Sequence, residues 1–188
     1  MNLLLYFIIY AVAGYLLETV YGYLLYRKYT VRRTMLTLPM CPVYGLGGVM
    51  MALLVAPLRI SPVSVFCGGF LVCSGVEYLY AAVSERRFGV MWWDYSAARW
   101  NVKGRICAAY SLMWGGLAFV FVYWIHPYVV WVVAPMSPYY KLILCAVLYS
   151  MFAKDLKDTA SELKKFSKGE ENSVEGVLPL KRCENRAV

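Results

Sequence analysis

The stretch LLLYFIIYAVAGYLLETVYGYLLY, residues 3 to 26, decides the fold class of this chain. Glu18 is its single charged residue. Spanning the ~30 Å hydrocarbon core of a bilayer takes about 20 apolar helical residues, because each residue of a helix rises about 1.5 Å. We therefore expect residues 3 to 26 to form a transmembrane helix.

Further apolar runs share this character, and we expect helices over residues 43–58, 61–83, 106–125 and 138–156. The chain is 61% hydrophobic, against roughly 45 to 50% for a soluble domain. Three prolines interrupt the segment from His126 to Pro138, so we interpret Tyr128 to Ala134 as an interfacial turn. The sequence predicts an all-α membrane protein, a bundle of about five transmembrane helices.

The basic residues predict the orientation of this bundle. With five spans, all of the 19 Lys and Arg residues except Arg59 and Lys141 fall on one side. Short loops rich in Lys and Arg face the cytoplasm. We therefore expect the N-terminus outside and the C-terminus in the cytoplasm. Although the net charge is +8, the charges separate apolar runs, so we expect membrane lipids and no nucleic acid as partners.

Residues 1–156 are expected to form the transmembrane bundle, and residues 157–188 a basic cytoplasmic segment. Leu163 and Phe166 share one helical face with Phe152, Leu156 and Ala160, and lysines flank this face. Such a pattern is typical of a helix that lies on anionic lipid headgroups. From Gly169 onward the composition is polar and mixed, which predicts disorder.

Two carboxylates, Glu18 and Glu77, lie deep in predicted spans, both about 12 Å from the cytoplasmic charges. Ionisable groups inside a membrane are usually paired or face a polar cavity. They would form the ligand, ion or proton site of a carrier, or they would pair with Arg or Tyr side chains to lock the bundle. Arg105 and Arg33 are the candidate cationic partners, and the sequence leaves the two alternatives open.

The predicted cytoplasmic loop, residues 84–104, mixes aromatic and polar residues more densely than a simple connector requires. Anchoring at the membrane interface explains the aromatic residues but not the polar residues among them. We therefore expect this segment to close the cytoplasmic side over Glu18 and Glu77. No metal-ligand spacing is present, and we expect neither a metal nor a cofactor. The candidate site residues are Glu18, Glu77, Asp94, Tyr95, Ser96, Asn101 and Arg105, with Arg33, Tyr44, Glu85, Trp93 and Arg99 as secondary candidates.

Several motifs in residues 5 to 125 carry a family resemblance: Glu18 in the first span, CPVYG at 41–45, E-x7-E-x2-F at 77–88, WDYS at 93–96, N-x2-GRI at 101–106 and Trp114-Gly115. On these motifs the chain resembles the small bacterial membrane proteins labelled putative ABC-transporter type IV permeases. It departs from them at Thr34, where a glycine usually follows the loop arginine, and at Leu38-Pro39, where Gly-Pro is usual. The resemblance implies transport in association with other subunits.

The chain contains no G-x4-GK[ST] phosphate loop, so we expect a separate nucleotide-binding subunit or an ion gradient to drive any transport. We also expect a homo-oligomer, because about five helices barely enclose a pathway. One alternative is a membrane enzyme acting on a lipid or lipid-linked substrate. In it Asp94, Glu85 or Glu77 would serve as acid or base, and Arg99 and Arg105 would bind phosphate. Another is an accessory or scaffold protein.

Overall fold

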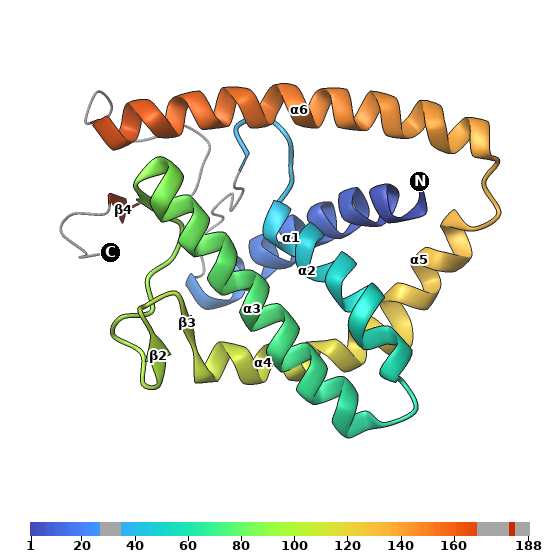
Figure 1. Ribbon diagram of the computed structural model, residues 1–188, viewed down its shortest axis with the longest axis horizontal. Coiled ribbons are helices and arrows are strands. Elements are labelled where there is room, and N and C mark those ends of the chain that lie inside the picture. The colour runs from blue at the N-terminus through green and yellow to red at the C-terminus, as the bar shows by residue number, and fades with distance from the viewer. Residues whose placement is uncertain (27–34, 169–180, 183–188) are drawn as a thin grey trace.

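The computed structural model describes residues 1–26, 35–168 and 181–182, and within them the chain is mostly helical (Figure 1). The α-helices are α1 (Asn2–Tyr26), α2 (Pro42–Met50), α3 (Pro62–Phe88), α4 (Ala108–Val120), α5 (His126–Val133) and α6 (Pro138–Lys168). The π-helical turns η1 (Met51–Val55) and η3 (Phe121–Ile125) and the 3₁₀ turn η2 (Ala56–Leu58) continue these helices. The strands are β1 (Val90–Met91), β2 (Asn101–Val102), β3 (Ile106–Cys107) and β4 (Lys181–Arg182).

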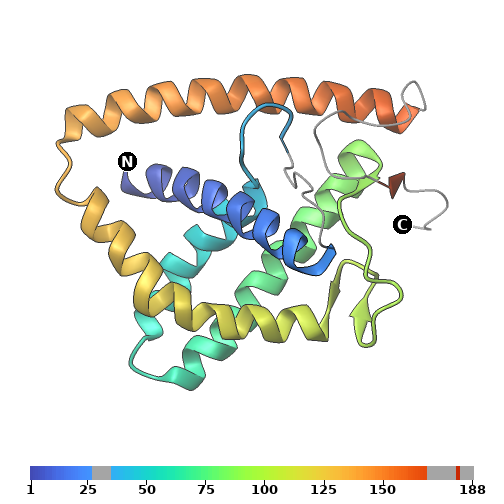
Figure 2. The ribbon, with the colours of Figure 1, turned by 180° about the vertical axis from the view of Figure 1, so that it is seen from behind.

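The helices pack as two neighbouring pairs, α1 against α2 and α3 against α4, and α6 runs along one side of the molecule (Figures 1 and 2). Glycines permit close approach within each pair. A Cβ on Gly45 of α2 would lie 2.8 Å from the backbone oxygen of Phe7, and a Cβ on Gly69 of α3 would collide with Ala118 of α4. Small residues at helix contacts are the usual means of packing helices in a membrane.

Among the described residues, three helices are long and apolar enough to cross a membrane: Asn2–Leu24, Pro62–Phe88 and Ala108–Val133. The helix Pro42–Leu58 is apolar but shorter. Large apolar side chains such as Leu16, Leu71 and Trp124 are exposed on their outer faces, where lipid takes the place of water. The predicted count of five spans and their orientation stay predictions.

The interfacial turn predicted for Tyr128 to Ala134 is wrong, because α5 continues α4 and η3 as one helix. Pro127 has no N–H and would normally interrupt the i→i−4 hydrogen bonds of a helix. The π-helical turn η3 precedes it, and the His126 N–H bonds to the Phe121 carbonyl instead. This wider turn absorbs the proline, so the helix passes the predicted end at Ile125.

The helix α6 also continues past its predicted end at Leu156 and reaches Lys168. Leu163 and Phe166 are buried with Val90 and Trp92 of the α3–α4 connection. The sequence had suggested that these two side chains lie on lipid headgroups. In the structure they pack on protein instead. In the tail, where disorder was predicted, β4 pairs antiparallel with β1; the rest of the tail lies outside the described residues.

Candidate functional site

Glu77 is a buried carboxylate of α3, with an exposed fraction of 6%. Two neutral donors from different elements hold it. The Tyr95 hydroxyl, from the loop after α3, donates to Oε1 at 3.1 Å. The Trp114 indole N–H, from α4, donates to Oε2 at 3.0 Å. Within the described ranges no cation lies within ion-pair distance of Glu77.

Glu18 lies on α1, half-buried, and accepts a 2.6 Å hydrogen bond from the Tyr44 hydroxyl of α2. The Tyr44 ring meets the Trp114 ring edge to face, with the centroids 5.6 Å apart. The donors of the two carboxylates, Tyr44 and Trp114, are therefore in contact. The contacts of the two carboxylates thus come from α1, α2, α3, α4 and the loop after α3.

Aromatic rings line the side of this pair where the loop after α3 lies. Tyr95 stacks on Tyr110 with centroids 4.8 Å apart, and the Tyr110 and Tyr21 hydroxyl oxygens lie 3.4 Å apart. Burial first, and then the negative charge of Glu77, raise the pKa of the Tyr95 phenol well above its ordinary value. Tyr95 therefore keeps its proton at physiological pH and remains a donor to Glu77.

The polar residues of the loop shape the backbone that carries Tyr95. Asp94 accepts hydrogen bonds from the Ser96 N–H at 3.0 Å and the Ser96 hydroxyl at 2.6 Å. The Asn101 amide donates to the Ala98 carbonyl at 2.8 Å and accepts from the Gly104 N–H at 3.0 Å. Side-chain to backbone bonds of this kind stabilise turns. In this loop Trp100, Lys103 and Gly104 all have positive φ.

Arg105 does not pair with Glu18 or Glu77, the partners considered from the sequence. Its Nε and Nη2 donate to Glu85 Oε2 at 3.0 and 2.6 Å, and its Nη1 donates to the Tyr78 hydroxyl at 2.9 Å. The hydrogen bonds to Glu85 raise the pKa of the Arg105 guanidinium further, so its charge is permanent. Arg33, the other candidate, lies outside the described residues.

The remaining candidates lie beside the site. The Trp93 indole donates to the Arg105 carbonyl at 2.8 Å and stacks on Tyr80, while Arg99 is exposed. In the part of the chain that the structure describes, no group of three or more His, Cys, Asp or Glu side chains is arranged to hold a metal.

Sequence reasoning missed the site roles of Trp114, Tyr110 and Tyr21. The one usable signal was Trp114, because an indole N–H inside an apolar helix must find an acceptor. It also missed Asp155 of α6. The Asp155 carboxylate accepts the Leu38 N–H at 2.8 Å and the Thr37 N–H at 3.1 Å, which fixes the segment that leads into α2.

Comparison with known proteins identifies the family of this chain. No curated protein and no solved structure matches the chain. The family model described as "Putative ABC-transporter type IV" matches residues 5–160, which include Glu18, Glu77, the 93–106 loop and Asp155. Together with its three membrane-length apolar helices, this match shows a membrane protein of transporter type, and the chain belongs to the putative ABC-transporter type IV family.

Proposed function

We propose that the protein is a small multi-pass permease-like subunit in the bacterial cell membrane, in which Glu18 and Glu77 form a cation or proton site closed by the loop that carries Tyr95. The chain has no phosphate loop of its own, so a separate nucleotide-binding subunit or an ion gradient supplies the work. A homo-oligomer would complete the pathway around the bundle.

The environment of Glu77 carries this proposal. An ionised carboxylate in an apolar interior costs several kcal/mol unless a cation or strong donors balance it. Glu77 is 6% exposed and its described partners, Tyr95 and Trp114, are neutral. A bound proton or a cation would complete the balance, and Glu18 would share it, because its donor Tyr44 contacts Trp114, a donor of Glu77.

The aromatic neighbours suit a cation as well. The Tyr44, Trp114, Tyr95 and Tyr110 rings surround the two carboxylates through the contacts given above. Aromatic faces attract cations, by roughly 0.5 to 2 kcal/mol per ring according to how dry the site is. The same surroundings disfavour an anion. Of the enzyme residues considered from the sequence, Arg105 and Glu85 pair with each other, and no contact favours a phosphate between them.

The first test measures binding of a cation at Glu77 rather than transport, because transport would depend on other subunits. Dicyclohexylcarbodiimide modifies carboxyl groups in apolar surroundings. We expect purified protein in nanodiscs to be modified at Glu77, and Na⁺, K⁺ or tetramethylammonium to slow this modification at least fivefold as its concentration rises. Mass spectrometry of the peptides gives the extent at each carboxyl group.

Two controls make the result specific. Glu18→Gln should weaken the protection of Glu77 by the cation, since half of the site's acidic charge is lost. Glu162→Gln should leave it unchanged, because Glu162 lies on α6 and pairs with Lys165. The proposal fails if none of the three cations protects Glu77 and if the modification rate is also independent of pH between 5 and 9.

A further inference from the structure

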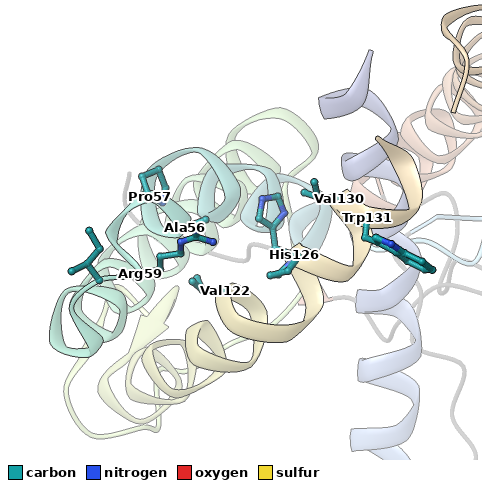
Figure 3. A pocket seen from close by; sticks show the side chains of 9 residues that line it. Ala56, Pro57, Arg59, Val122, His126, Val130 and Trp131 are labelled. Atoms are coloured by element: carbon teal, nitrogen blue, oxygen red, sulfur yellow. The ribbon is translucent and has the colours of Figure 1, made fainter. Parts of the chain in front are cut away.

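A pocket lies far from the two carboxylates, between the end of η2 and the helix formed by η3 and α5 (Figure 3). His126 follows Trp114 by twelve residues on one continuous helix, about 18 Å along its axis. The cavity has a volume of about 690 Å³, within the range of about 300 to 1,000 Å³ for small-molecule sites. Its walls are mainly apolar and include Pro57, Val122, Val130 and Trp131.

Arg59 supplies a cation to this pocket. Its backbone is fixed because its carbonyl accepts a 2.7 Å hydrogen bond from the Tyr123 hydroxyl. Figure 3 shows its guanidinium directed toward His126. Among the described residues no carboxylate pairs with Arg59. The guanidinium therefore has its donors available to a ligand.

His126 supplies a second polar group, and its ring is held in place. Its Nδ1 lies 2.7 Å from the Tyr10 hydroxyl oxygen of α1, and Tyr10 is buried. The ring also stacks on Phe121, with the centroids 5.6 Å apart, and meets Tyr6 edge to face. When the phenol donates to Nδ1, the imidazole carries its proton on Nε2, the nitrogen left for the pocket.

We infer that this pocket binds an amphipathic anion, a carboxylate or phosphate group attached to an apolar chain. Arg59 would hold the anionic oxygens in its planar fork, and His126 would donate one further hydrogen bond. The apolar walls take the chain, and the exposed side chains of Ile60 and Trp131 at the pocket extend this apolar surface outward. The site is independent of Glu18 and Glu77.

Quenching of Trp131 fluorescence by brominated ligands tests the inference. Wild-type protein in vesicles of neutral phosphatidylcholine should be quenched by brominated dodecanoate, and Trp131→Phe should lose most of the saturable quenching. Arg59→Gln should weaken binding at least tenfold, and Arg59→Lys should weaken it less, since the charge stays. Arg86→Gln is the matched control, because Arg86 is exposed at the far end of α3 and should leave binding unchanged.

Comparing different brominated ligands shows whether the anion belongs to a membrane lipid or to a free amphiphile. Quenching by brominated phosphatidylglycerol in the vesicles assigns the site to a lipid headgroup, and quenching by brominated dodecanoate alone assigns it to a free amphiphile. Equal binding of brominated dodecanol and dodecanoate would overturn the inference, because the pocket would then be merely apolar. Equal binding by wild type and Arg59→Gln, or no saturable quenching by either anion, would overturn it too.

Discussion

Replacing Asp155 by alanine should release the segment before α2 from α6. Asp155 is 3% exposed, and its carboxylate accepts the N–H groups of Thr37 and Leu38. One turn later, the Thr159 hydroxyl accepts the Leu36 N–H at 3.2 Å. Residues 35 to 40 form no helix or strand of their own, so these bonds fix the path of the chain into α2.

The size of the effect follows from the bonds that are lost. A hydrogen bond to a charged group contributes about 1.5 to 3 kcal/mol, and an unsatisfied buried donor costs about 1 to 3 kcal/mol. Thr37 is exposed, so water can replace its bond, whereas the half-buried Leu38 N–H loses its partner. We expect the segment to open more easily by about 2 to 3 kcal/mol, which is roughly 30- to 150-fold in the opening equilibrium.

Cys41 reports this opening, because it is 1% exposed and its N–H bonds to the Ala11 carbonyl at 2.9 Å. The assay is alkylation of Cys41 by a membrane-permeant maleimide, with Cys67 and Cys183 replaced by serine. Asp155→Ala should accelerate labelling by the stated factor, and Asp155→Asn should do so less. Asp158→Ala is the control, because Asp158 is exposed on the same helix. Equal labelling rates for Asp155→Ala and Asp158→Ala would refute the reasoning.

Further substitutions test the packing and the loop. Gly69→Ala should destabilise the α3–α4 pair by about 1 to 3 kcal/mol through overpacking, whereas Gly116→Ala, with nothing within 4 Å of its Cβ, should be neutral; thermal unfolding in detergent compares them. Arg105→Lys should speed tryptic cleavage of its loop severalfold, because an ammonium group cannot contact Glu85 and Tyr78 at the same time, as the planar guanidinium does. An unchanged cleavage rate would contradict this. Tyr95→Phe keeps the ring but removes the donor to Glu77, so carbodiimide modification of Glu77 should change at least threefold, and an unchanged rate would count against the loop's role.

The helices and the acidic pair could be predicted because their signals are local. Apolar runs of sufficient length identify helices, and a carboxylate within such a run stands out without knowledge of its partners. The equal depth of Glu18 and Glu77 was also a local count, and it stays a prediction; the structure links their donors Tyr44 and Trp114 through a ring contact. The function of the pair stays a prediction.

The misses arose where the outcome depends on a backbone adjustment or on a distant partner. A proline normally interrupts a helix, and the residues around Pro127 give no sequence signal for the π-helical turn that accommodates it. Asp155 stands beside Lys154 at the end of a predicted span and resembles an ordinary surface charge, while its partners Thr37 and Leu38 are more than 115 residues away in the sequence. Arg105 was considered as a candidate partner of Glu18 or Glu77, although its observed partner Glu85 is nearer along the chain.

The balance of charge distinguishes Glu77 from two other polar contacts of α3 with its neighbours, Ser74–Ser111 and Glu85–Arg105. Ser74 donates to Ser111 at 2.7 Å, and both hydroxyls are neutral, so this pair needs nothing further. Arg105 meets Glu85, and their charges cancel. Glu77 alone among these receives only neutral donors, from Tyr95 and Trp114, at a depth where an unbalanced charge is costly. Asp155 also receives only neutral donors, but two backbone N–H groups from one segment bind it, whereas Glu77 receives two side-chain donors from separate elements. A proton or a cation at Glu77 would complete its balance of charge, which is what the proposed site requires.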